Sequence, residues 1–322
     1  MSKRMLLFTG RCHPQFAQAV AHELGPDVEL GNVKCKKFAN GEIYVRYLES
    51  VRGAEVFLIQ SLCQPINDAL MELLIMIDAA KRASAADVCV VIPHFGYARQ
   101  DKKSAAREPI TAKLVADLLT TAGANRIITM DLHQGQIQGF FNMPVNHLTA
   151  LGVLADYYRS LNLDMDQVVI VSPDVGRAKA CKKLSDMLGC SLAIMHKGRP
   201  EHNQAEITSV IGKVRDKTCI INDDMIDTAG SICAGAVALE QKGAKAIYAG
   251  ATHGIFSDPA YERINASPII ECAVTDTIPV PAEQQQQGKI KVLSVAPMFA
   301  KAISNVYTDA SVSDLFDPDF QL

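Results

Sequence analysis

The chain has 322 residues, 48% of them hydrophobic and 21% charged, and its formal net charge is -3. This length predicts two domains, because a single domain commonly holds about 100–200 residues. A slightly negative net charge does not suggest a general binder of nucleic acids or membrane surfaces, and a small anionic substrate would need a local positive site.

Neither the apolar runs nor the cysteines indicate a membrane or an oxidising compartment. The chain lacks the roughly 18 consecutive apolar residues of a membrane helix, and its apolar start stops at Thr9-Gly10, too early for a signal peptide. The nine cysteines include no Cys-x-x-Cys pair, and residues such as Cys89 and Cys219 have apolar neighbours. Reduced thiols in a cytoplasmic protein are therefore expected.

Short apolar runs alternate with helical stretches along the chain. The predicted strands are Met5–Thr9, Glu55–Gln60, Asp87–Pro93, Arg126–Asp131, Val168–Ser172, Ser191–Met195, Thr218–Asn222 and Ala246–Thr252. Predicted helices between them include Asn67–Ala83, Thr111–Ala122 and Ser231–Lys242. Nearly continuous apolar runs are typical of strands covered on both faces. Alternation of such strands with helices predicts an α/β fold with mainly parallel sheets flanked by helices.

This pattern runs twice, and the two series predict two domains. The first series ends near Asp131 and the second begins near Val168, so residues 1–150 and 151–303 are the predicted domains. We expect the segment of about 304–322 to pack back on the first domain. The polar run Gln284–Gln287 is expected in a surface loop. Because ligands of open parallel sheets bind beyond the carboxyl ends of the strands, the loops that follow strands are the candidate sites.

The stretch after Thr218–Asn222 combines acids with small residues. Its order is Asp-Asp-Met-Ile-Asp-Thr-Ala-Gly-Ser, residues 223–231, and a predicted helix follows. Backbone N–H groups at a helix start bind anions, and carboxylates accept hydrogen bonds from ribose hydroxyls. We expect the adjacent acids to stay out of the core, because a buried unpaired charge is costly. The alternative is a helix start capped by Asp227 or Thr228. This order resembles the phosphoribosyl-binding signature of type I phosphoribosyltransferase folds.

Four further segments narrow the choice among the reactions that such a fold could catalyse. They are Phe38–Glu42, Tyr97–Lys103, Asp131–His133 with the following Gln134–Phe141, and His196–Arg199. In this order they resemble the ribose-phosphate pyrophosphokinase family, and the resemblance runs from about Leu7 to Phe316. It implies two similar type I phosphoribosyltransferase-like domains, the first binding ATP and the second ribose 5-phosphate. It also implies a magnesium-dependent transfer of the diphosphoryl group of ATP to ribose 5-phosphate, giving phosphoribosyl diphosphate and AMP.

The resemblance assigns roles to individual residues. Lys197 and Arg199 are the expected catalytic residues, on a flexible loop that closes over the phosphates. The expected ATP-binding residues are Phe38, Asn40, Gly41, Glu42, Arg99, Gln100, Asp101, Lys102 and His133. The expected ribose 5-phosphate residues are Arg199, Asp223, Asp224, Asp227, Thr228, Ala229, Gly230 and Ser231. His133 and Asp174 are the expected magnesium residues, with His133 touching phosphate or a metal-bound water as the alternative.

Other interpretations of the nucleotide residues remain open. Phe38 is either an adenine-stacking aromatic or a core residue, and Arg99–Lys103 is either a nucleotide contact or a charged surface turn. The chain also departs from the family at two positions. Arg177 stands where the family has the second of two consecutive glycines, and it either crowds the loop or adds a phosphate contact. Asn40 stands where aspartate is common.

Regulation and assembly follow from the resemblance alone. Family members of the commonest class are activated by phosphate and inhibited by ADP at a subunit interface, and they assemble as hexamers in which ATP residues come from different subunits. The matching residues here are Ser50, Arg52, Ser84, Arg107, Ser311 and Ser313. Serines and arginines are also common on surfaces. A homo-oligomer with no nucleic-acid or membrane partner is expected.

Two other functions compete with this one. A phosphoribosyltransferase would share residues 223–231 but would leave the Arg-Gln-Asp-Lys and Asp-Leu-His segments unexplained. An inactive regulatory subunit would be similar in sequence but typically carries an insertion near the catalytic loop. Met195–Arg199 is uninterrupted here. A repressor on the same fold would need an added basic DNA-binding module, which is not visible.

Overall fold

A computed structural model describes residues 4–198 and 206–312. The chain forms two compact units. The first comprises Met1–Thr149, Thr277–Pro279 and Val295–Leu322, and the second comprises Ala150–Asp276 and Val280–Ser294. The chain therefore returns to the first unit from Val295, earlier than the predicted residue 304.

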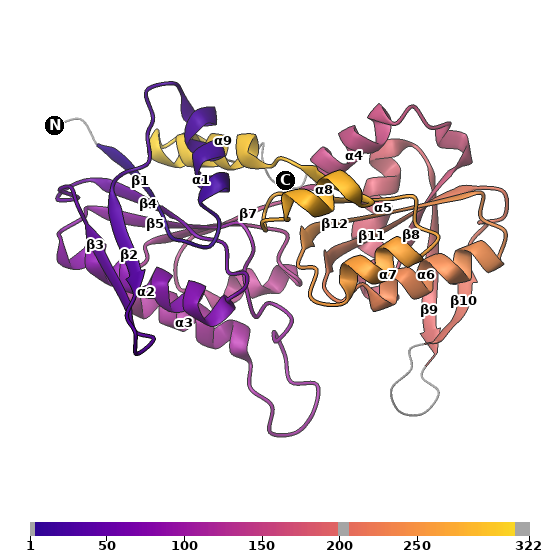
Figure 1. The fold of residues 1–322 in the computed structure, drawn as a ribbon, viewed down its shortest axis with the longest axis horizontal. Helices are drawn as coiled ribbons and strands as arrows, with labels where there is room; N and C mark the ends of the chain where they lie inside the picture. Colours follow the sequence, from indigo (N-terminus) through magenta and orange to yellow (C-terminus); the bar gives the residue numbers. More distant parts are fainter. Residues whose placement is uncertain (1–3, 199–205, 313–322) are drawn as a thin grey trace. The chain divides into compact units, whose positions relative to one another are not determined.

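The first unit is built on a five-stranded parallel sheet in the order β1-β4-β5-β6-β7 (Figure 1). The strands are β1 (Met5–Thr9), β4 (Glu55–Ile59), β5 (Asp87–Ile92), β6 (Arg126–Met130) and β7 (Val145–Leu148). Its helices are α1 (Pro14–Leu24), α2 (Ile66–Arg82), α3 (Thr111–Ala122) and α9 (Ala296–Tyr307), with a 3₁₀ turn at Gly135–Phe140. Every residue of β4 is buried because helices cover both faces of the sheet.

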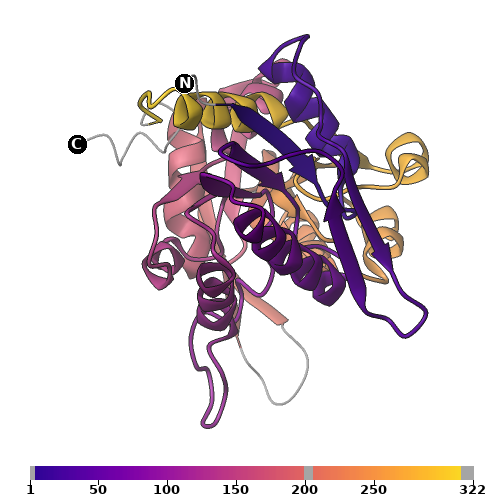
Figure 2. The same ribbon diagram turned by 90° about the vertical axis from the view of Figure 1, so that its left-hand side faces the viewer.

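Helices from opposite ends of the chain pack together on this sheet. Helix α9 lies beside α1 in both views (Figures 1 and 2), and the rings of Phe16 and Phe299 meet edge to face with centroids 5.3 Å apart. Helices α2 and α3 cover the other face. There Leu73 and Leu119 join one core with strand residues such as Val56.

A separate antiparallel hairpin, β2 (Val33–Lys37) and β3 (Ile43–Tyr47), packs against α2. Its last residue anchors it, because the Tyr47 hydroxyl donates a 2.9 Å hydrogen bond to the Met76 carbonyl and its ring packs on Phe8. The turn between the two strands therefore projects from a fixed base.

The second unit holds a seven-stranded sheet in the order β10-β9-β8-β11-β12-β13-β14. The strands are β8 (Val168–Ser172), β9 (Ser191–Gly198), β10 (Glu206–Ile211), β11 (Thr218–Ile226), β12 (Ala246–Gly254), β13 (Glu271–Thr275) and β14 (Ile290–Leu293). The helices are α4 (Leu151–Ser160), α5 (Ala178–Leu188), α6 (Gly230–Gln241), α7 (Ala260–Ala266) and α8 (Ala282–Gln287), with 3₁₀ turns at Met165–Gln167 and Val175–Arg177. Within the described part of this sheet, the β9–β10 pair is antiparallel and the other neighbouring strands are parallel.

Alternate residues of β8 face different helix layers. Ile170 belongs to the core formed with α4 and α5, whereas Val169 and Val171 belong to the core formed with α6 and α7. Side chains of a strand alternate between faces, so a continuous apolar run buries both. The predicted α/β class with parallel sheets flanked by helices is confirmed.

Helix α8 was expected to be a loop, and strands β9, β11 and β12 run beyond their predicted ends. Gln284–Gln287 was expected in a loop but belongs to helix α8, which follows Pro281 at its N-cap; glutamine and glutamate are good helix formers. Strand β11 continues to Ile226 instead of ending at Asn222, because β12 pairs with it as far as Ile226–Gly254. This extension matters for the site.

Candidate active site

The turn after β8 and the acids of β11 lie side by side. These strands are parallel neighbours whose register ends at Val171–Ile221, so the residues that follow reach the same edge of the sheet. In the turn, the Asp174 carboxylate accepts a 3.0 Å hydrogen bond from the Arg177 N–H. The Ser172 hydroxyl donates to the Asp174 carbonyl at 2.7 Å. The turn thus presents Asp174 and Arg177 next to the acidic pair.

Asp223 and Asp224 are strand residues, not loop residues as expected, and one of them is buried. Asp224 is 2% exposed. The expectation that neither acid enters the core is therefore wrong for Asp224. The physical reason is an ion pair: Arg177 Nε lies 3.7 Å from Asp224 Oδ1 and 3.5 Å from Asp223 Oδ1. A paired charge tolerates burial that an isolated one does not.

The two acids influence each other. Burial, a hydrogen bond with Asp224 and the negative charge of Asp224 raise the pKa of the Asp223 carboxyl to about 7, and Arg177 opposes the rise. The Asp224 N–H also donates to Asp223 Oδ1 at 2.8 Å. With a pKa of about 7, the Asp223 carboxyl changes its charge near neutral pH. In its ionised form it accepts hydrogen bonds from hydroxyl groups.

The loop of Asp227–Ala229 leads directly into α6, whose first residues are Gly230 and Ser231. Ala229 is the N-cap and adopts φ 58°, a left-handed conformation that residues with a side chain rarely take. Such strain is concentrated at ligand sites in proteins. Arg263 of α7 donates to the Thr228 carbonyl at 2.9 Å and so holds this loop. Sequence reasoning missed Arg263, because no motif around it signals the contact.

Lys197 lies in strand β9, not in the loop expected from the family resemblance. Its backbone pairs with Ile207 of β10, and the register shifts between Ile207 and Ser209. Arg199 lies outside the described residues.

In the first unit, Phe38 stands at the exposed turn of the β2–β3 hairpin. It is 42% exposed, which excludes the core interpretation. Lys36 Nζ lies 4.5 Å from its ring centroid, and Tyr44 packs edge-on with centroids 5.7 Å apart. The turn is tight, because the Phe38 N–H donates to the Glu42 carbonyl at 2.8 Å and Gly41 has φ 93°. An exposed ring of this kind can stack on a planar base.

Asn40 takes part in the same turn. Its side-chain oxygen accepts a 3.2 Å hydrogen bond from the Glu42 N–H, as in an Asx turn. Aspartate, the residue common at this position in the family, can make the same contact. The substitution therefore preserves the local geometry.

The remaining nucleotide candidates follow β5 and β6. In the turn after β5, Tyr97 has φ 64°, the Gln100 N–H donates to the Tyr97 carbonyl at 2.9 Å, and Asp101 is only 7% exposed. Arg99 and Lys102 belong to the same turn. His133 follows Asp131, whose φ is 37°, in the loop after β6. Parallel pairing of β5 and β6 brings both loops to one edge of the sheet.

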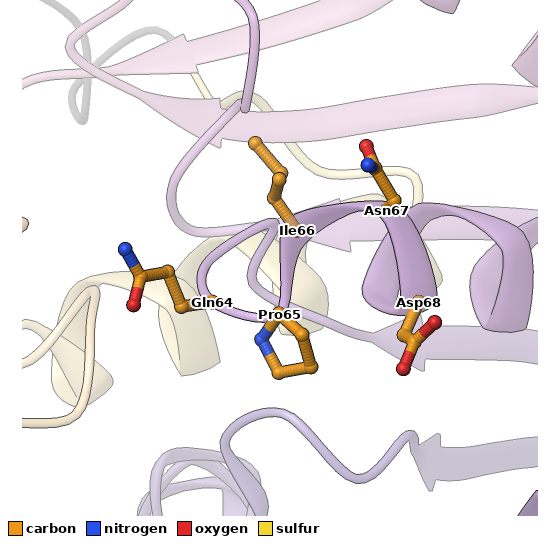
Figure 3. Close-up of a pocket in the computed structure, with 5 residues that line it drawn as sticks. All are labelled: Gln64, Pro65, Ile66, Asn67 and Asp68. Carbon is orange, nitrogen blue, oxygen red and sulfur yellow. The ribbon is translucent and has the colours of Figure 1, made fainter.

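A pocket of about 710 Å³ lies at the start of α2. It is lined by Gln64, Pro65, Ile66, Asn67 and Asp68. Figure 3 shows Asn67 and Asp68 leaving the first turn of α2 in different directions. Asp68 pairs with Lys37 of the hairpin at 2.7 Å, and Asn67 accepts from the Tyr97 hydroxyl. Sequence reasoning missed both contacts, since each crosses about thirty residues.

The residues matched to a regulatory site lie in separate parts of the first unit. Ser50 and Arg52 precede β4 and Ser84 precedes β5; the Gly53 N–H donates to the Ser84 carbonyl at 2.8 Å. Arg107 lies in the long loop between β5 and α3. Ser311 follows α9, where its carbonyl accepts from the Asn305 side chain at 2.6 Å. Ser313 lies outside the described residues.

Within the described residues, no group of three or more His, Cys, Asp or Glu side chains is arranged to hold a metal ion. Magnesium does not need one, because it retains waters and is commonly held by one or two carboxylates and substrate phosphates. The Asp174 carboxylate at the sheet edge fits that donor set. Over the same part of the chain, no helix is long and apolar enough to cross a membrane.

Comparisons with known proteins agree on one family. Residues 5–123 match the N-terminal domain of ribose phosphate pyrophosphokinase, and residues 202–317 match the phosphoribosyl synthetase-associated domain. A ribose-phosphate pyrophosphokinase of Clostridium perfringens is 52% identical over 98% of both chains. One from Caldanaerobacter subterraneus subsp. tengcongensis is 54% identical over 96% of this chain and 97% of its own.

A solved structure is similar over nearly the same length. The phosphoribosylpyrophosphate synthetase of Mycobacterium smegmatis superposes with a TM-score of 0.90 at 46% identity. The match covers 96% of this chain and 100% of the other. Both units of the fold therefore have counterparts in that protein.

Proposed function

This chain belongs to the ribose-phosphate pyrophosphokinase family, and from that premise we propose how its residues carry the reaction. It is a ribose-phosphate diphosphokinase. The enzyme transfers the β,γ-diphosphoryl group of ATP to the anomeric hydroxyl of ribose 5-phosphate, and AMP leaves. The observation that carries the residue assignment is the meeting of Asp174, Arg177, Asp223 and Asp224 at the edge of one sheet.

Asp223, Asp224 and the loop from Asp227 to Ser231 hold ribose 5-phosphate. The loop leads into the N-terminus of α6, where backbone N–H groups favour an anion, so the 5-phosphate binds there. Carboxylates accept hydrogen bonds from sugar hydroxyls. The acids and the loop belong to one strand and its extension, so one chain supplies the whole sugar site.

Asp174 and His133 hold magnesium with ATP, Asp174 as an oxygen ligand and His133 as a ligand or a phosphate contact. Magnesium held there would supply positive charge that offsets the charge developing on the phosphate oxygens. Lys197 and Arg199 add positive charge at the transferred group, and preorganised donors of this kind contribute about 10²–10³ each in rate.

Phe38, Asn40, Gly41 and Glu42 bind the adenosine part of ATP, and Arg99, Gln100, Asp101 and Lys102 bind its phosphates. In the family these two groups come from different subunits, so we propose that the enzyme is a homo-oligomer, assembled as a hexamer. We also propose that it works in the cytoplasm. Sedimentation analysis tests the assembly. A monomer with full activity would contradict it.

Phosphate activation and ADP inhibition belong to the same proposal. Ser50, Arg52 and Ser84 gather at the amino ends of β4 and β5, and Arg107 and Ser311 lie elsewhere in the unit, as expected if two chains complete the site. Activity is measured in phosphate-free buffer as phosphate is added. Full turnover without phosphate would place the enzyme outside the phosphate-activated class.

The decisive experiment is phosphorus NMR of the purified protein with ATP, magnesium, phosphate and ribose 5-phosphate. AMP and phosphoribosyl diphosphate should appear, with no ADP. An inactive regulatory subunit would bind ligands without turnover. That alternative is not favoured, because Met195–Gly198 is continuous with β9 and relatives of about 50% identity are named as the enzyme.

A further inference from the structure

Arg177 contacts both acids of the sugar site from the turn after the neighbouring strand. Its Nε lies 3.5 Å from Asp223 Oδ1 and 3.7 Å from Asp224 Oδ1, and its side chain is only 18% exposed. The Asp224 side chain is 3% exposed. At this burial the guanidinium attracts the carboxylates much more strongly than a surface cation would.

The backbone of the turn holds Arg177 in place. Its N–H donates to the Asp174 carboxylate, and its φ of -92° is negative and lies in a region that residues with side chains adopt in turns. The turn therefore accepts a large side chain here without left-handed strain, which argues against crowding as the consequence of this residue. One arginine consequently links the residue assigned to magnesium with the two residues assigned to the sugar.

We propose that Arg177 is a positioning residue for ribose 5-phosphate. It offsets the negative charge of Asp223 and Asp224 and holds their carboxylates where the sugar hydroxyls arrive. Without it, two adjacent carboxylates would repel each other and the incoming phosphate. This inference rests on the proposed function, because it takes the acidic pair as the sugar site.

The test compares Arg177→Gln, Arg177→Lys and a matched control, Lys182→Gln. Lys182→Gln removes the same charge from α5, but Lys182 pairs with an exposed acid, Asp186, away from the proposed sugar site. Calorimetry with ribose 5-phosphate alone should show at least tenfold weaker binding for Arg177→Gln. Arg177→Lys should recover most of the loss and Lys182→Gln should bind normally. In turnover assays the KM for ribose 5-phosphate should rise, while kcat and the KM for ATP change by less than about threefold.

A stability cycle keeps the inference testable if Arg177→Gln weakens the fold. Asp223→Asn should raise Tm more in the Arg177→Gln background than in the wild-type background, because it then removes an uncompensated charge. Equal effects in both backgrounds would overturn the inference. An increase in the KM for ATP alone would also overturn it, because Arg177 would then be a contact of the ATP phosphates.

Failure of this inference is distinguishable from failure of the proposed function. If the wild-type chain forms phosphoribosyl diphosphate but Arg177→Gln binds ribose 5-phosphate normally, only the role of Arg177 is wrong. If the wild-type chain shows no turnover while calorimetry and the stability cycle give the expected results, the reaction is wrong and the role of Arg177 in sugar binding stands.

Discussion

The acidic pair of the second unit and the aromatic hairpin of the first unit differ in how completely their surroundings are built. Asp224 is 2% exposed and pairs with Arg177, whereas the ring of Phe38 is 42% exposed and packs against the edge of Tyr44 and the ammonium of Lys36. Buried charges require partners at fixed positions, while an exposed ring requires none. The proposed sugar site is therefore preformed within one unit, and the proposed adenine contact is left open to a ligand or another chain.

The largest expected effect concerns β9, which β8 separates from the strand of the acidic pair. Lys197→Ala should lower kcat by about 10²–10³, because it removes a positive charge at the transferred group. The measurement is turnover of ATP with saturating ribose 5-phosphate. Lys213→Ala is the control, since Lys213 is an exposed lysine after β10. Near-normal turnover of Lys197→Ala with an unchanged melting curve would remove Lys197 from catalysis.

Arg263→Ala tests whether the loop of Asp227–Ala229 depends on the hydrogen bond from Arg263 to the Thr228 carbonyl. The Thr228 carbonyl would lose a charged hydrogen bond, and charged hydrogen bonds contribute about 1.5–3 kcal/mol, so we expect the KM for ribose 5-phosphate to rise about tenfold. The KM for ATP should not change. Glu262→Ala, an exposed change in the same helix, is the control. Equal KM values for the two variants would show that the loop holds its shape alone.

Phe38→Ala tests whether the exposed ring of the β2–β3 hairpin stacks on the adenine base of ATP. Loss of base stacking worth about 1 kcal/mol should raise the KM for ATP roughly fivefold and leave the KM for ribose 5-phosphate unchanged. Leu48→Ala, which truncates a 58% exposed apolar side chain just after β3, should affect neither. If both variants behave alike, Phe38 does not contact the base.

The smallest expected effect is on stability. Because the pKa of Asp223 is raised to about 7, the folded protein binds this proton more tightly than the unfolded chain, so ionisation destabilises the fold as pH rises from about 4 to about 7. Asp223→Asn should match wild type in Tm near pH 4 and exceed it at pH 8. An advantage of about 1 kcal/mol corresponds to roughly 2–4 °C.

The control for this titration is Glu240→Gln, at an exposed acid of α6. Its Tm difference from wild type should not follow the same pH window. A flat difference for Asp223→Asn would mean that Arg177 fully compensates the acid.

Eight of the described strands, several helices between them and the order of the motifs could be predicted from the sequence alone, whereas β2, β3, β7, β10, β13 and β14 were not predicted. These features depend on short-range signals: apolar runs such as Val168–Ser172 bury both faces, and the acids and small residues of 223–231 mark a strand-to-helix loop. The family could also be predicted, because its motifs are long and ordered. Local sequence patterns of this kind can be recognised without knowing which strands pair.

Only the tertiary structure decided which distant side chains meet. The pairing of β8 with β11 brings Arg177 to Asp224 and buries an acid that was expected to remain exposed. The packing of α7 brings Arg263 to Thr228. Each contact crosses tens of residues and depends on strand order and register, which no local pattern encodes. For this reason the sequence determined the loops that carry the chemistry, and the fold determined the charges that surround them.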